Sequence, residues 1–355
     1  MVNMNNNEFV YFGMYLKDYL EESHISQSEF ANKLGITQKH MNEMLNGKAN
    51  ITLEMAANIE RLTGISVSFI ITIENDRKMK EELLKKYGSE KELKETLKND
   101  FSFNELKKNN WISFNDVTDT FRNALDILNF LKVKNFDVHE NLEKQVLFKK
   151  TGEDYNKLAL WISHCDEISA SQKVNDYQSQ NFDKIITELK KYSFEKGYDF
   201  DKLTKIFNKY GVYFVCEKAL SGTKVRGCFK VKEKNPAIYC TQNYHAKDSL
   251  YFEIFHELGH CKSDYNMAKS KTIIDGDSKI EKRADDFAIN TMISKEQWSE
   301  IKRDFDNNNS ISNLKDRILY FSKKYRISPS FIAGRMAKMN MINYNSKIYN
   351  ELKDV

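Results

Sequence analysis

The sequence predicts an α+β fold that is mostly α: an all-α bundle at the amino end, a helical middle region, and a carboxy-terminal domain with a small β-sheet. Apolar residues recur at helical spacing over most of the 355 residues. Capping residues and glycines divide the first part of the chain into short helices. Three short apolar runs in the second half have the length and flanks of strands. The expected divisions are a first domain at 1–74, a helical linker and middle region at 75–206, and a third domain at 207–355.

The first domain has the pattern of a helix-turn-helix. Residues 26–29, Ser-Gln-Ser-Glu, match a capping box that opens a helix. Gly35 then turns the chain, and Thr37 caps a second short helix that ends near Asn46. A further helix over 52–62 is expected to complete a small bundle.

This segment resembles the HigA-like branch of the XRE repressor family, through the runs 25–31, 34–36 and 42–48. The resemblance implies that the second helix enters the major groove of double-stranded operator DNA, with a homodimer on a two-fold site. Exposed side chains of that helix would contact base edges, and Gln and Asn favour adenine. The residues expected to contact bases are Gln38, Lys39, His40 and Asn42, and those expected to hold phosphates are Gln27 and Lys48.

The charge of residues 1–74 opposes this interpretation, because nine Asp and Glu outnumber five Lys and Arg. A DNA-binding face is usually strongly basic, so non-specific affinity should be weak. The alternative is a helical bundle that serves dimerisation or partner binding. Lys33, Lys39 and Lys48 do gather near the expected groove-facing edge.

The middle region is expected to be helical. Residues 75–110 are rich in Lys and Glu and predict a charged connecting helix or pair of helices. Amphipathic patterns follow at 121–131, 155–162 and 182–193. Towards the carboxy end, another helix is expected from 311 to 325.

The three apolar runs that predict strands lie at 212–216, 227–231 and 237–241. The third is the expected exposed edge, along which an extended peptide could add itself as a further strand. A protein bound in this way would have to offer an unfolded or loop-like segment.

The helix that follows carries His256-Glu257-Leu258-Gly259-His260. Residues four apart on a helix share a face, so the two imidazoles converge on one point. A second helix, from about 279 to 292, offers Glu281 as a third ligand, and these groups with an open water position match a catalytic Zn2+ site. Asp285 is expected to accept the free ring N–H of one histidine. Glu257 is expected to be the general base.

Two alternatives stay open for this cluster. The third ligand could come from Asp275 or Asp277, although their loop has no helix to hold it rigid. The cluster could also be an acidic helix beside two histidines that make ordinary hydrogen bonds. Nearby side chains that could stabilise an oxyanion are Tyr244, His245 and Tyr251, and the spacing selects none of them.

The runs 211–215, 236–239, 255–260 and 281–288 together resemble the ImmA/IrrE family of metallopeptidases. The resemblance implies a gluzincin-like fold, zinc held by the two histidines and the downstream Glu, and action against a DNA-bound repressor in phage and stress systems. The family usually has Asn where this chain has Asp285, and Asp can accept the same hydrogen bond.

Composition and the lack of targeting signals predict a cytoplasmic protein. Five cysteines, none of them in a Cys-x-x-Cys pair, indicate a reducing compartment. No apolar run approaches the length of a membrane span, and the start of the chain lacks a signal-peptide core. The net charge of +4 does not by itself imply nucleic acid or a membrane as partner.

Together these features predict a DNA-binding zinc endopeptidase that regulates transcription by cleaving a protein substrate, a repressor or antitoxin-like regulator. One alternative is a non-enzymatic transcription regulator or antitoxin whose zinc-peptidase fold senses a ligand or partner. Another is a protein in which zinc is purely structural.

Overall fold

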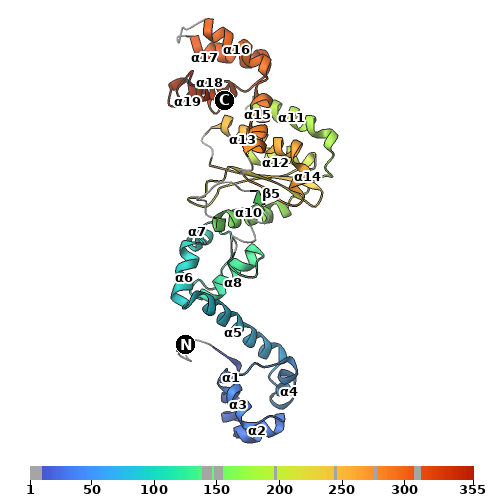
Figure 1. Ribbon diagram of the computed structural model, residues 1–355, viewed down its shortest axis with the longest axis vertical. Helices are drawn as coiled ribbons and strands as arrows, with labels where there is room; N and C mark the ends of the chain where they lie inside the picture. The colour runs from blue at the N-terminus through green and yellow to red at the C-terminus, as the bar shows by residue number, and fades with distance from the viewer. Residues whose placement is uncertain are drawn as a thin grey trace. The chain divides into compact units, whose positions relative to one another are not determined.

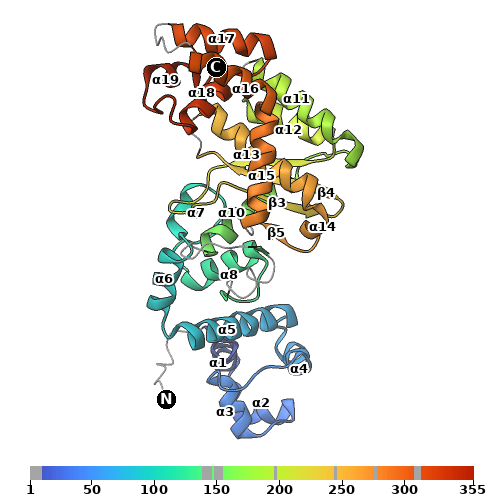
Figure 2. The same ribbon diagram turned by 45° about the horizontal axis from the view of Figure 1, so that its top comes forward.

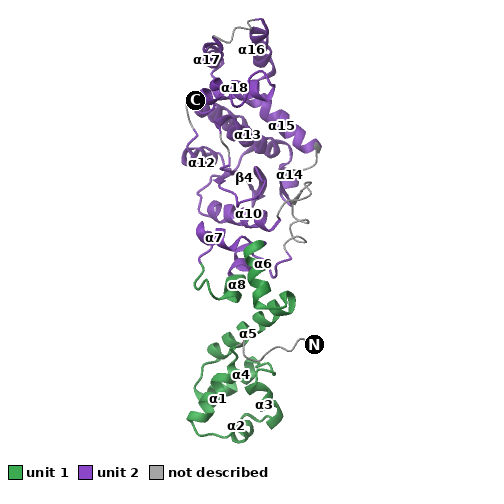
Figure 3. Cartoon of the chain, turned by 90° about the vertical axis from the view of Figure 1, so that its left-hand side faces the viewer, with its two compact units in different colours: residues 1–99, 114–125 green, residues 100–113, 126–355 purple. Residues whose placement is uncertain are grey.

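The computed structural model describes residues 10–137, 146–147, 155–195, 198–243, 246–274, 278–307 and 313–355. These residues are mostly helical and contain a small mixed sheet, so the predicted mostly-α class with a small sheet is confirmed. The chain divides into two compact units (Figure 3). Unit 1 contains residues 1–99 and 114–125, and unit 2 contains residues 100–113 and 126–355.

Unit 1 begins with the predicted all-α bundle. The backbone N–H of Glu29 donates to Ser26 Oγ at 3.1 Å, and that of His40 donates to Thr37 Oγ1 at 3.1 Å, so both predicted caps are present. Gly35 follows the first of these helices with a φ of 70°, which suits glycine. The helices are α1 (Phe12–Glu22), α2 (Gln27–Leu34), α3 (Gln38–Leu45), α4 (Leu53–Thr63), α5 (Val67–Tyr87) and α6 (Glu90–Asn99).

A glycine fixes α3 against α1. A Cβ atom on Gly13 would lie 2.4 Å from the backbone oxygen of Met44, so a larger residue would force the two helices apart. Buried apolar side chains surround this contact. They include Phe12, Leu16, Phe30, Met41 and Leu45, each no more than 1% exposed. One face of α3 is therefore held in the core, and the opposite face points to solvent.

Helix α5 continues through residues that the sequence assigns to a connecting region. Its Lys- and Glu-rich second half has high helix propensity, so nothing in the sequence ends the helix before Gly88. Arg77, 5% exposed, donates to Glu74 at 3.1 Å and to the side chain of Asn50 at 3.0 Å. These bonds fasten α5 to the segment that follows α3.

Unit 2 combines the sheet with the remaining helices. Its strands are β1 (Val146–Leu147), β2 (Tyr213–Glu217), β3 (Gly227–Lys232), β4 (Asn235–Thr241) and β5 (Thr272–Ile273). Its first helices are α7 (Phe103–Lys108), α8 (Thr120–Leu131, which begins in unit 1), α10 (Tyr155–Ala170), α11 (Phe182–Phe194) and α12 (Phe200–Lys209), with a 3-10 turn at Ser179–Asn181. The later ones are α13 (Lys247–Ser263), α14 (Tyr265–Ala268), α15 (Ser278–Met292), α16 (Lys295–Asn307), α17 (Leu314–Tyr325), α18 (Pro329–Lys338) and α19 (Lys347–Leu352).

All three predicted strands form, but the prediction that residues 237–241 are an exposed edge is wrong. The described strands lie in the order β1-β5-β3-β4-β2, and β4 pairs antiparallel with β3 and parallel with β2. Ile238 and Tyr239 point to opposite faces of the sheet and both are 0% exposed. A strand that is apolar on both faces belongs in the middle of a sheet, which excludes peptide addition along β4.

One edge of the described sheet is β2, and a side chain covers part of it. The amide of Gln172 donates to the backbone oxygen of Phe214 at 2.6 Å and accepts from its N–H at 3.2 Å. Such a side chain satisfies the backbone groups that would otherwise bind another strand.

Helices cover both faces of the sheet, with α10 on one face and α13 on the other (Figure 1). Asp166 of α10 accepts hydrogen bonds from Tyr239 at 2.7 Å and from Lys230 at 2.9 Å, which ties that helix to β3 and β4. On the other face, α15 packs along α13, and α18 carries the carboxy-terminal helices against α13 (Figure 2). Helix α13 is therefore enclosed on several sides.

Candidate metal centre and DNA interface

The two helices that carry the predicted metal ligands lie in close contact. A Cβ atom on Gly259 of α13 would lie 3.0 Å from Cα of Ala284 on α15. This close approach brings Glu281 of α15 over the face of α13 that holds His256 and His260. The three residues that the sequence predicts as ligands are thus brought together.

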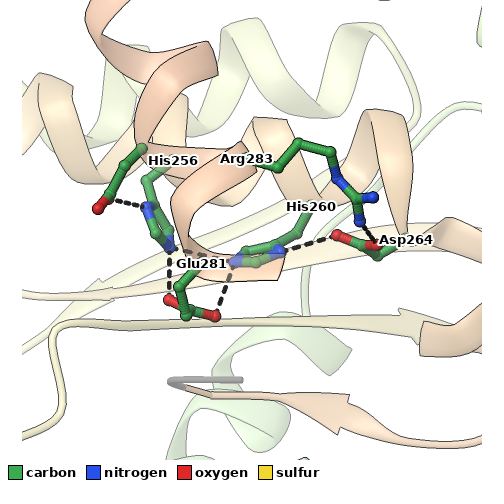
Figure 4. Close-up of polar contacts among 6 residues, drawn as sticks. His256, His260, Asp264, Glu281 and Arg283 are labelled. Carbon is green, nitrogen blue, oxygen red and sulfur yellow. Dashed lines mark hydrogen bonds and ion pairs between the residues drawn. The ribbon is translucent and has the colours of Figure 1, made fainter. Parts of the chain in front are cut away.

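The donor atoms of these residues converge on one point (Figure 4). Nε2 of His256 lies 3.1 Å from Nε2 of His260. The two oxygens of Glu281 lie 3.2 Å from Nε2 of His256 and 3.5 Å from Nε2 of His260. Ligands of a tetrahedral zinc ion, each about 2.1 Å from the metal, are about 3.4 Å apart, so the donor set fits this geometry.

Carboxylates fix the orientation of both imidazoles. Asp285 Oδ1 lies 2.9 Å from Nδ1 of His256, which is the contact expected from the sequence. Asp264 Oδ2 lies 3.0 Å from Nδ1 of His260. Because a carboxylate only accepts, each Nδ1 must carry a proton, which leaves each Nε2 as the ring nitrogen that faces Glu281 and could bind a metal.

Asp264 was missed in the sequence, and so was its partner. It is 4% exposed, and Arg283 of α15 forms an ion pair with its other oxygen (Figure 4). Two signals were available: Asp264 follows His260 by four residues, and Arg283 follows Glu281 by two. The pair links the end of α13 to α15 beside the donor set.

The electrostatics of the cluster favour a cation. Burial by itself would lower the pKa of His256, but hydrogen bonds with Asp285 and Glu281 outweigh it and raise the pKa to about 11. Two ring nitrogens and a carboxylate that face each other need a shared proton or a metal ion between them. In the metal-free protein the proton supplies that charge.

The predicted base, Glu257, is 3% exposed on the same helix. Burial raises its pKa well above the usual range, the neighbouring His256 opposes this rise, and the nearby Glu253 adds to it. Its Oε2 has no hydrogen-bond partner among the residues that the structure describes. A Cβ atom on Gly227 would lie 2.4 Å from its Oε1, so a glycine in β3 makes room for this carboxyl group.

Of the other sequence candidates, the structure describes only Tyr251. Asp275, Asp277, Tyr244 and His245 lie outside the described residues. Tyr251 is 0% exposed and packs against aromatic rings of the core, including Phe331 at 5.5 Å between ring centroids, so it does not face the metal ligands.

The predicted DNA-contacting residues gather on α3 and around it in unit 1. Gln38, Lys39 and Asn42 are exposed on α3, and His40 is partly exposed. Glu43 lies 3.9 Å from both Lys39 and His40, which reduces the positive field of this surface. Gln27 at the start of α2 and Lys48 after α3 are also exposed.

A known protein family matches the segment that contains this α3 surface. Residues 16–87 match the family model described as Helix-turn-helix. The amino-terminal segment is a helix-turn-helix. The match supports a DNA-binding transcription regulator, and its residues run to the end of α5. A comparison with curated proteins found no match. Among the described residues, no helix is long and apolar enough to cross a membrane.

We expect Asp264 to contribute to zinc affinity. Replacing it with Ala removes the acceptor that orients His260, so zinc affinity should fall about 10- to 100-fold. Asp264→Asn keeps an oxygen that can accept from Nδ1 and should lose less. Chelator competition on the full chain measures both, with the exposed Asp286→Ala as the control. Equal affinity of Asp264→Ala and the unmodified protein would rule out this role.

We also expect zinc binding to release protons. The pKa of His256 in the metal-free protein is raised above its ordinary 6.5 to about 11, so the ring is protonated at pH 7 and zinc must displace that proton. This proton stabilises the metal-free fold fully below pH 6.5, and the stabilisation is lost as pH rises through 11. Zinc affinity should therefore increase with pH above neutrality. Calorimetric zinc titrations in two buffers of different ionisation enthalpy should give different heats, and equal heats would contradict the prediction.

Proposed function

We propose that this protein is a DNA-binding zinc endopeptidase that regulates transcription by cleaving another regulatory protein. The observation that carries the proposal is the convergence of His256, His260 and Glu281 beside a buried acid, Glu257, in a chain that begins with a helix-turn-helix. The resemblance of the surrounding sequence to the ImmA/IrrE metallopeptidases supports the same activity.

The residues fit the metal that the proposal requires. His256, His260 and Glu281 would hold the zinc, with Asp285 and Asp264 orienting the two rings. When bound, zinc lowers the pKa of a water molecule towards about 7 and so supplies a nucleophile at neutral pH. The surrounding protein keeps the two histidines no more than 7% exposed, in a setting where electrostatic interactions are strong.

Glu257 would act as the general base and then as the acid. Glu257 follows His256 in the sequence, and its Oε1 faces Gly227 of β3. Its buried Oε2 has no hydrogen-bond partner among the described residues. This oxygen would take a proton from the attacking water and later deliver it to the leaving amine. Burial raises the pKa of Glu257 above its usual range, which helps this carboxyl group to hold the proton that it has taken until the leaving amine accepts it.

The proposed substrate is a repressor or an antitoxin-like regulator, and the proposed second partner is operator DNA. Binding of the helix-turn-helix to an operator would raise the local concentration of the peptidase near other proteins on the same DNA. Because β4 is central, a substrate segment would have to bind elsewhere than along that strand.

A second candidate is a transcription regulator without catalysis, in which the metal centre senses a ligand or partner. The observation that favours it is the extent of the family match, which covers the helix-turn-helix and leaves the metal centre outside. Both candidates predict DNA binding, and only the first predicts a cleaved protein.

Replacement of Glu257 by Gln separates the two candidates. The amide cannot accept the proton, so cleavage should fall about 10²- to 10⁴-fold while zinc content and DNA binding stay unchanged. The assay incubates the zinc-loaded full chain with the proteins encoded beside its gene and looks for a specific fragment. Glu296→Gln, at an exposed position, is the matched control. A fragment produced equally by Glu257→Gln would exclude the proposed mechanism.

A homodimer on a two-fold operator is the expected DNA-bound form. Its two α3 helices should occupy half-sites whose centres are about 34 to 36 Å apart, or a multiple of this. Nuclease footprinting of the intact protein measures the spacing. Protection of single, unpaired half-sites would argue against the dimer.

A further inference from the structure

A chain of three side chains runs from α1 to the exposed face of α3. Lys17 Nζ donates to Asn46 Oδ1 at 3.2 Å. Asn46, which follows the last turn of α3, donates from Nδ2 to the side-chain oxygen of Asn42 at 2.9 Å and to its backbone oxygen at 2.7 Å. Asn42 is exposed, and it is one of the residues expected to contact bases.

The orientation of the Asn46 amide follows from its neighbours. An ammonium group only donates, so the group that faces Lys17 must be the oxygen. A backbone carbonyl only accepts, so the group that faces the main chain of Asn42 must be the NH2. Both contacts demand the same orientation, which leaves the Asn46 amide a single arrangement.

The orientation of Asn42 then follows from that of Asn46. The NH2 of Asn46 is a donor, so Asn42 must meet it with Oδ1. This leaves the NH2 group of the exposed Asn42 as the end of its amide that Asn46 does not hold. An amide held in this way can offer donors to a base edge, while one lone pair of its oxygen is engaged within the protein.

We propose that Lys17 and Asn46 set the base preference of α3 by holding Asn42 with its NH2 towards the DNA. This inference rests on the DNA-binding part of the proposed function. A donor in the major groove pairs with N7 of adenine, with N7 or O6 of guanine, or with O4 of thymine, whereas cytosine offers only a donor there. Asn42 therefore discriminates against cytosine at its position, where the sequence alone suggests adenine.

Asn46→Asp removes the donor with almost no change in size. A carboxylate still accepts from Lys17 but cannot donate to either oxygen of Asn42, so the main-chain contact is lost and the Asn42 amide is favoured with its NH2 inwards and its oxygen outwards. An acceptor in the major groove pairs with the amino groups of adenine N6 or cytosine N4. This variant should accept C at the position where the unmodified protein rejects it.

Selection from a random duplex library with the full-length protein tests this assignment. Asn46→Asp should change the preference at one position of each half-site, by about tenfold between G and C, and leave the other positions unchanged. Asn32→Asp, which adds the same charge at an exposed position of α2, is the control and should weaken all sites evenly.

A second measurement uses the unmodified protein alone, so that it does not depend on the folding of a variant. 7-Deazaadenine at the same position lacks N7, the one major-groove acceptor of adenine, and should weaken binding by about tenfold. Identical preferences for Asn46→Asp and the unmodified protein, or full binding to 7-deazaadenine, would overturn the assignment while leaving DNA binding intact. Failure of the unmodified protein to enrich any sequence would overturn the DNA-binding function itself.

Discussion

The candidate site in the second unit depends on one constraint. Two imidazole nitrogens and a carboxylate face one another in a buried space. Nε2 of His256 and Nε2 of His260 are only 3.1 Å apart, and both approach Glu281. Because carboxylates occupy the opposite ring nitrogens, neither ring can turn away without losing a hydrogen bond. Such an arrangement is stable only with positive charge at its centre, which is why a divalent cation fits the site and why the metal-free protein retains a proton there.

The surrounding fold maintains this convergence through backbone contacts rather than long side chains. Gly259 lets α15 approach α13, and Gly227 lets β3 pass beneath Glu257. The buried Asp264 with Arg283 adds a polar link between the same two helices. Residues of α13 and α15 thus determine most of the geometry of the candidate metal site, and β3 lies next to Glu257 on the side of the sheet. Gly13 has the same role in unit 1, because the absence of a side chain there lets α1 and α3 approach each other closely.

Local signals in the sequence predicted local structure well. The caps Ser26 and Thr37 depend on residue type at a helix start, and the convergence of His256 and His260 depends on helical periodicity, and the structure contains all of them. The position of Glu281 depends in addition on the packing of α15 against α13. Sheet order was not accessible in this way, because an apolar run such as 237–241 looks the same at an edge and in the centre until its neighbours are known. Asn46 was missed for a related reason, because its partner Lys17 lies on another helix. Asp264 follows His260 by one helical turn, so a local signal for it was present in the sequence.

The metal content of the purified full-length protein tests the proposed centre most directly. After dialysis against metal-free buffer, elemental analysis should find one divalent ion per chain, with zinc the expected element, and a folded variant in which Glu281 and His260 are both replaced by Ala should contain almost none. Protein that is folded yet binds no stoichiometric divalent ion, even after incubation with zinc, would show that the three donor atoms meet for another reason. The hydrolytic function would then have to be abandoned.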